Sequence, residues 1–157
     1  MNQPEKSLST ASPDDRSEAA ELLARYGELI DAGDFAGVGQ LLSEAVVEGP
    51  DGTPIAQGSA EIEALYVAMT RRFEDGTPRT AHIITNIIVE LVGVDTFEMR
   101  SRFTVFQATD QFPLQPVVVG RYVDKVKRID NRLAFVSRRM IPELWGDASA
   151  HLVHLGT

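Results

Sequence analysis

The sequence has no cysteine, one tryptophan and no long apolar run. The lack of cysteine excludes disulfides, thiolate nucleophiles and cysteine-based zinc sites, and it fits a reducing cytoplasm, where we expect the protein to reside. No stretch approaches the roughly 20 apolar residues that cross a bilayer, and the N-terminus lacks the basic cluster and apolar run of a signal peptide. We therefore expect a soluble protein without a membrane partner.

Basic residues are scarce relative to acidic ones. The chain has 15 Lys and Arg against 23 Asp and Glu, which gives a formal net charge of −8 at pH 7. Binding to a phosphate backbone calls for a basic face, so we expect no nucleic-acid partner. Acids gather in the first part of the chain, and basic residues dominate from Arg100 onward. An acidic helix and a basic sheet could attract each other, or both could simply be solvated faces.

The remaining composition describes one globular domain. The chain has 157 residues, of which 43% are apolar, enough to bury a sizeable core. Residues 1–11 are polar and aperiodic and predict a mobile N-terminal tail. We expect the folded domain over residues 12–145 and a C-terminal tail over residues 146–157.

The first half of the chain predicts three helices. Ser12 can cap a long helix, whose apolar residues recur at three- and four-residue spacing until Gly33 ends it. Asp34 can cap a short second helix. Ser59 can cap a third, which is expected to run to about Phe73.

The second half predicts long β-strands. Their expected ranges are 80–92, 96–109, 117–129 and 133–141, after two short strands at 45–48 and 55–57. Pro142 is expected to end the sheet. Helices followed by antiparallel strands are an α+β order, and a strongly curved sheet wrapped over the first helix would enclose a cavity suited to a small molecule.

Three stretches of the sequence resemble a known superfamily. They are Leu-Ala-Arg-Tyr with Leu-Ile-Asp-Ala-Gly-Asp-Phe within residues 23–35, Arg-Thr-Ala-His-Ile-Ile-Thr-Asn at 79–86, and Gly-Arg-Tyr-Val-Asp at 120–124. They resemble the SnoaL-like branch of the nuclear-transport-factor-2-like superfamily, with its scytalone dehydratase and bile-acid dehydratase members. The resemblance implies an α+β, cone-shaped barrel, in which a strongly curved antiparallel sheet wraps around a long N-terminal helix with two further helices.

The resemblance also implies an activity. Superfamily enzymes that eliminate water or halide use an aspartate of the first helix to orient a histidine of the strand, which removes a proton from the substrate. Carried over, these residues are Asp31 and His82, and Tyr26 matches a tyrosine of the bile-acid enzyme. This implies a cofactor-independent lyase or isomerase, acting like a dehydratase on a small apolar cyclic or polyketide-like compound. The second histidine and the asparagine of scytalone dehydratase have no clear counterpart.

The chemistry of the residues agrees with this assignment. Histidine has an ordinary pKa of about 6.5, which suits proton abstraction near neutral pH, and a carboxylate on its second nitrogen fixes the tautomer. An acid at Asp31, in the last turn of a helix, opposes the helix dipole and so calls for a specific partner. The plainer alternatives are that His82 is a core histidine satisfied by the backbone and that Tyr26 belongs to the core.

Further residues are candidates for the pocket wall. A strand period of two places Ile84 and Asn86 on the face of His82, although Asn86 could equally bond to the backbone at a bulge. Tyr122 is a third candidate. Arg138 and Arg139 are adjacent and point to opposite sides of a strand, and the sequence leaves open which one reaches the cavity.

No metal site or cofactor motif is present. His151 and His154 lie three residues apart near the C-terminus, but without a dense cluster of acids they are better explained as part of a solvated tail. Glycine-rich phosphate loops are absent. We therefore expect no metal and no cofactor.

Two matters stay open at this level. A non-catalytic small-molecule-binding or scaffold module could use the same pocket, and the substrate is not readable because specificity lies in pocket shape. Superfamily barrels form dimers and trimers, so the resemblance implies a homodimer or a homotrimer.

Overall fold

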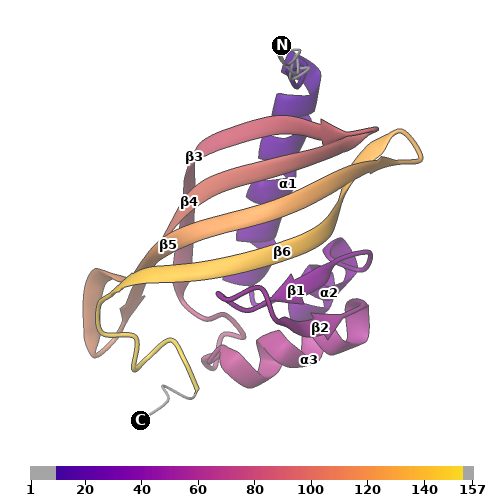
Figure 1. The fold of residues 1–157 in the computed structure, drawn as a ribbon. Coiled ribbons are helices and arrows are strands. Elements are labelled where there is room, and N and C mark those ends of the chain that lie inside the picture. Colours follow the sequence, from indigo (N-terminus) through magenta and orange to yellow (C-terminus); the bar gives the residue numbers. More distant parts are fainter. Residues whose placement is uncertain (1–9, 154–157) are drawn as a thin grey trace.

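The computed structural model describes residues 10–153, which form a curved sheet packed against one long helix (Figure 1). The helices in this part of the chain are α1 (Pro13–Asp31), α2 (Phe35–Leu41) and α3 (Ser59–Met69). The strands are β1 (Val46–Glu48), β2 (Pro54–Gln57), β3 (Thr80–Gly93), β4 (Thr96–Thr109), β5 (Phe112–Ile129) and β6 (Arg132–Trp145). None of these helices is long and apolar enough to cross a membrane. The expectations for residues 1–9 and for His154 lie outside the described residues.

The described strands form one unclosed sheet in the order β2-β1-β6-β5-β4-β3. Strands β3 to β6 are an antiparallel meander that curves around α1, whereas α2 and α3 lie at one end with β1 and β2 (Figure 1). This confirms the predicted α+β fold with a strongly curved sheet. The sheet is mixed rather than wholly antiparallel, because β1 runs parallel to β6.

The start and the end of α1 lie where the sequence predicts them. The Ser12 hydroxyl accepts a hydrogen bond from the Asp15 backbone N–H at 3.1 Å, and the Asp15 carboxylate accepts one from the Ser12 backbone N–H at 2.9 Å. This reciprocal capping box satisfies two amides that a helix start leaves without partners. Beyond the helix, Gly33 has a φ of 72°, which a glycine adopts without strain, and Asp34 caps α2.

Several predicted boundaries are wrong, and β5 begins at Phe112 rather than at residue 117. Ser59 does not cap α3, which follows Gly58 and has no side-chain cap. The helix ends at Met69 rather than near Phe73, because the next residue adopts an extended conformation. Pro142 does not end β6, since it lies opposite Gly120 at an irregularity in the register, where a missing N–H is tolerated.

The acidic helix and the basic sheet do attract each other at one contact. The Arg128 guanidinium on β5 donates to Asp15 at 2.6 Å and to Glu18 at 3.0 Å. Glu18 also accepts a hydrogen bond from the Leu133 backbone N–H at 2.6 Å. The first half of α1 is thereby tied to the β5–β6 turn.

Candidate active site

Asp31 and His82, 51 residues apart in the sequence, form a hydrogen-bonded pair. His82 Nδ1 lies 2.6 Å from Asp31 Oδ1, and the His82 backbone N–H donates to Asp31 Oδ2 at 2.8 Å. The Thr80 hydroxyl donates to Asp31 Oδ1 at 2.7 Å. Asp31, the last residue of α1, therefore finds its specific partners at the start of β3.

These bonds keep Asp31 ionised and select the tautomer of the His82 ring. Burial raises the pKa of Asp31, but the hydrogen bonds and the charge of His82, with the Thr80 hydroxyl, outweigh it and leave that pKa below its ordinary value. Because a carboxylate accepts hydrogen bonds only, the proton between the two side chains belongs to His82 Nδ1. His82 Nε2 is then the nitrogen with a free lone pair. Since the His82 side chain is only 4% exposed, this lone pair is sheltered from bulk water.

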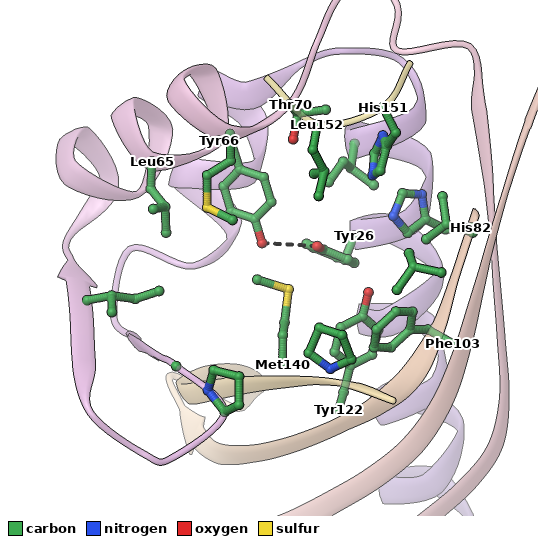
Figure 2. Close-up of a pocket in the computed structure, with 18 of the residues that line it drawn as sticks. Tyr26, Leu65, Tyr66, Thr70, His82, Phe103, Tyr122, Met140, His151 and Leu152 are labelled. Atoms are coloured by element: carbon green, nitrogen blue, oxygen red, sulfur yellow. Dashed lines mark hydrogen bonds between the residues drawn. The ribbon is translucent and has the colours of Figure 1, made fainter. Parts of the chain in front are cut away.

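The His82 ring reaches a cavity of about 320 Å³ between the C-terminal half of α1, α3, the inner face of the sheet and residues 151–152 (Figure 2). The wall is mostly apolar, with Ile30, Leu65, Phe103, Val105, Val118 and Met140 among its residues. The polar side chains at the wall are few and come from tyrosine, histidine, threonine and Trp145, with Glu48 as the only carboxylate. Such a cavity suits a small, largely apolar molecule with one or two polar atoms.

Three tyrosines contribute hydroxyl groups to this cavity. The Tyr26 and Tyr66 hydroxyl oxygens lie 3.0 Å apart, and the Tyr26 ring meets the His82 ring edge to face, with centroids 6.3 Å apart (Figure 2). Burial raises the pKa of Tyr66 and of Tyr122 well above the ordinary value. These two phenols therefore stay protonated around neutral pH. Tyr26 and Tyr122, both predicted site residues, lie in the cavity wall.

Arg138 is the arginine that points inward, and it is fully buried. Its guanidinium lies between the rings of Tyr26, 3.7 Å from the centroid, and Tyr122, 3.9 Å from the centroid. Asp124 is fully buried beside it, with Nε to Oδ1 at 3.8 Å, and neither side chain makes a hydrogen bond. Arg138 is not among the residues of the cavity wall. Arg139 is only partly buried.

Ile84 and Asn86 do not line this cavity. Ile84 packs toward α1 in a separate depression that is also lined by Gly27 and Asp31. Asn86 is exposed, has a φ of 54°, and lies where the β3–β4 register shifts between Thr85 and Ile88. The extra residue of this bulge reverses the alternation of β3, so the period of two from His82 fails at Asn86.

His151 belongs to the cavity wall, so the expectation that it lies in a solvated tail is wrong. Only 6% of the residue is exposed. Sequence analysis missed it, together with Tyr66, because only chain folding brings either residue to the cavity that His82 reaches. Within residues 10–153, no group of three or more His, Cys, Asp or Glu could hold a metal ion.

The curved sheet, the covering helix and the apolar cavity between them are typical of the nuclear-transport-factor-2-like class of α+β folds. The profile of the SnoaL-like domain family matches residues 11–139, which is most of the chain. The chain therefore belongs to the SnoaL-like family. No curated protein matches the chain.

Solved structures share the fold at low sequence identity. An NTF2-like protein with a cystatin-like fold from Novosphingobium aromaticivorans is 27% identical, with 87% of this chain and 86% of that chain covered and a TM-score of 0.66. A candidate aromatic ring hydroxylase of the same organism has 21% identity, coverages of 89% and 98%, and a TM-score of 0.69. A candidate scytalone dehydratase, also from that organism, has 18% identity, coverages of 83% and 85%, and a TM-score of 0.65.

Proposed function

We propose that this chain is a cofactor-independent lyase or isomerase that removes a proton from a small, largely apolar cyclic or polyketide-like ketone. The observation that carries the proposal is the 2.6 Å contact between Asp31 and His82, whose ring faces an apolar cavity. The candidate scytalone dehydratase of the same fold is consistent with this reaction class.

In this mechanism His82 is the general base and Asp31 is its positioning residue. His82 Nε2 takes a proton from the carbon next to the substrate carbonyl, and the C–H electron pair moves toward the carbonyl. The Asp31 carboxylate stabilises the imidazolium that forms. In an isomerisation, His82 returns the proton to another carbon. In a dehydration, a β-hydroxyl leaves with that proton as water.

Tyr26 is the proposed proton donor or substrate anchor. Its hydroxyl lies 3.0 Å from that of Tyr66, so one phenol can donate to the other while the free O–H is directed at a substrate oxygen. A leaving hydroxyl held by a donor is a better leaving group, because the charge that develops on oxygen is shared.

Two bicyclic ketones test the proposal without knowledge of the natural substrate. In D₂O, 1-tetralone exchanges its C2 protons when a base removes them, and nuclear magnetic resonance follows this exchange. Loss of water from 3-hydroxy-1-tetralone gives 1-naphthol, which fluorescence detects. We expect the wild-type protein to accelerate both reactions and His82→Gln to lose about 10²–10⁴-fold of the rate, as expected for a missing general base.

Asp31→Asn should lower the rates of exchange and dehydration at least about tenfold. The Asp31→Asn/His82→Gln double variant should be no slower than His82→Gln alone. This follows because Asp31 acts only through His82. Glu28→Gln, which removes an exposed carboxylate from the same helix, is the matched control. Exchange and dehydration at the wild-type rate in the double variant would refute the general-base role. Ligand binding without any turnover would favour the non-catalytic binding module instead.

We also propose that the chain forms a homodimer or homotrimer through the outer face of the sheet. The register aligns Ile83, Thr104, Val119 and Leu144 in one row across β3 to β6. Ile83 is 48% exposed and Leu144 is 65% exposed. Because three of these four side chains are apolar, burying the row against another copy of the chain is more favourable than leaving it in water.

A further inference from the structure

The C-terminal segment, residues 147–153, places His151 over the cavity and holds it there. The Arg71 backbone N–H donates to the His151 carbonyl at 2.9 Å, and the Val153 backbone N–H donates to the Met69 carbonyl at 3.0 Å. From β4, the Gln107 side-chain amide donates to the carbonyl of Ala150 at 3.2 Å. His151 is therefore carried by a segment that is bonded to both α3 and the sheet.

The His151 ring lies beside the His82 ring at the cavity (Figure 2). Burial first, and then the nearby His82, lower the pKa of His151 to about 4, while Asp31 acts in the opposite direction. His151 is therefore neutral at pH 7 and carries one N–H group.

The His151 proton belongs on the nitrogen that can reach a ligand. Nδ1 is buried and has no hydrogen-bond partner. A proton on Nδ1 would bury an N–H without an acceptor, a state that folded proteins rarely tolerate. With the proton on Nε2, the ring offers a donor that a ligand oxygen in the cavity can satisfy.

We propose that His151 is a second ligand-contacting residue, which donates a hydrogen bond from Nε2–H to the carbonyl oxygen of an uncharged cyclic ketone. This inference rests on the proposed function, because it completes the same reaction. When His82 takes the proton from the neighbouring carbon, negative charge moves to this oxygen and an enolate forms. His151 then stabilises the enolate as a neutral donor inside an apolar site, where such a bond is strong.

The surroundings of His151 explain why the ligand is neutral and carries an oxygen acceptor. The Arg138 guanidinium lies between the rings of Tyr26 and Tyr122 and is not part of the cavity wall. It therefore offers no direct contact to an anionic ligand. The one carboxylate in the wall, Glu48, disfavours an anionic ligand. The donors around the cavity are thus neutral N–H and O–H groups, which match a ketone better than a carboxylate or a phosphate.

A matched pair of probes tests this proposal by affinity alone. 1-Tetralone and tetralin share a bicyclic frame and differ in the carbonyl oxygen. We expect the wild-type protein to bind 1-tetralone about tenfold more tightly than tetralin, the worth of one buried hydrogen bond. His151→Leu should lose this preference while it binds tetralin with unchanged affinity. His151→Gln, which keeps an N–H donor, should retain part of the preference.

Infrared spectroscopy of bound 1-tetralone provides a readout that a purely structural role would not change. The carbonyl stretch should lie at lower frequency in wild type and His151→Gln than in His151→Leu. No preference for the ketone in the wild-type protein, or an unchanged preference and stretch in His151→Leu, would overturn the role of His151. The role of His82 is tested separately: a ketone preference with no exchange at C2 would overturn the proposed function and leave His151 as a binding residue.

Discussion

At the scale of single residues, the least expected feature is the ion pair inside the cone. Arg138 has the largest side chain among those that are fully buried, and Asp124 lies beside it without a hydrogen bond. Burial raises the pKa of Asp124, Arg138 lowers it, and the net result is a pKa of about 6. Two aromatic faces, those of Tyr26 and Tyr122, supply cation–π contacts to the guanidinium in place of hydrogen bonds.

Removing one partner of this pair should destabilise the protein far more than removing both. We expect Arg138→Met to lower the free energy of unfolding by about 3–5 kcal/mol at pH 7.5, because the Asp124 carboxylate is left buried and unpaired. The loss should shrink toward pH 5, since a protonated carboxyl group is easier to bury. Asp124→Leu/Arg138→Met should recover most of it. Urea unfolding measures all three proteins, and a double variant as unstable as Arg138→Met would refute this account.

At the scale of elements, the sequence patterns do not reveal that the C-terminal segment packs at the cavity or that β3 changes face along its length. Residues 147–153 pack beside the cavity instead of extending into solvent, as the Thr70–Leu152 bridge and the Gln107 amide show. Strand β3 changes face at the Asn86 bulge, so that His82 and Ile84 point inward and later the buried Val89 does so. Both effects arise from contacts with elements distant in sequence.

The burial of His151 predicts an acid-sensitive step in stability. Its pKa is about 4 in the folded protein against an ordinary 6.5, so the unfolded chain binds more protons between these values. The stabilisation is complete above pH 6.5 and is lost as the pH falls toward 4, by about 3 kcal/mol in all. His151→Gln should have a flatter profile of unfolding free energy over this interval. Parallel profiles for the two proteins, measured by urea unfolding, would contradict the prediction.

At the scale of the whole molecule, the inner face of the sheet is covered by α1 and the cavity, and the outer face carries the exposed side chains of Ile83 and Leu144. The apolar row from Ile83 to Leu144 lies on this outer face because its members alternate with inward residues such as Phe103 and Tyr122. The proposed self-association and the proposed ligand binding would therefore use opposite sides of the same sheet.

The proposed oligomer is tested by introducing charge into that row. Wild-type protein should have the mass of a dimer or trimer by light scattering, and Leu144→Glu should shift it toward the monomer, because a charge would be buried at the interface. Leu114→Glu is the matched control, since Leu114 is 71% exposed and lies outside the row. A wild-type protein that is monomeric at every concentration would refute the proposal.

Much of the fold follows from short-range patterns. The cap at Ser12, the apolar stripe of α1, the break at Gly33 and the turn-separated strands are local signals, and the structure confirms them with small changes in boundaries. The family was indicated by three stretches, at 23–35, 79–86 and 120–124, and the domain profile over residues 11–139 confirms it. Ile84 keeps the inward face that the strand period predicts, whereas Asn86 lies at a bulge, the alternative that the sequence left open, because a bulge depends on the register with β4 rather than on the residues of β3 alone.

The sequence by itself determined the element types and the acidic character of α1, because these depend on residue type and on periodicity along one chain segment. The Asp31–His82 pair was implied by the resemblance to the superfamily, since the two residues lie 51 positions apart in the chain. Only the tertiary structure decided that Arg138 rather than Arg139 is buried, that Tyr66 meets Tyr26, and that His151 faces the cavity. The physical reason is distance along the chain. Burial, desolvation and cavity shape are properties of several elements packed together, and no local pattern of residues encodes them.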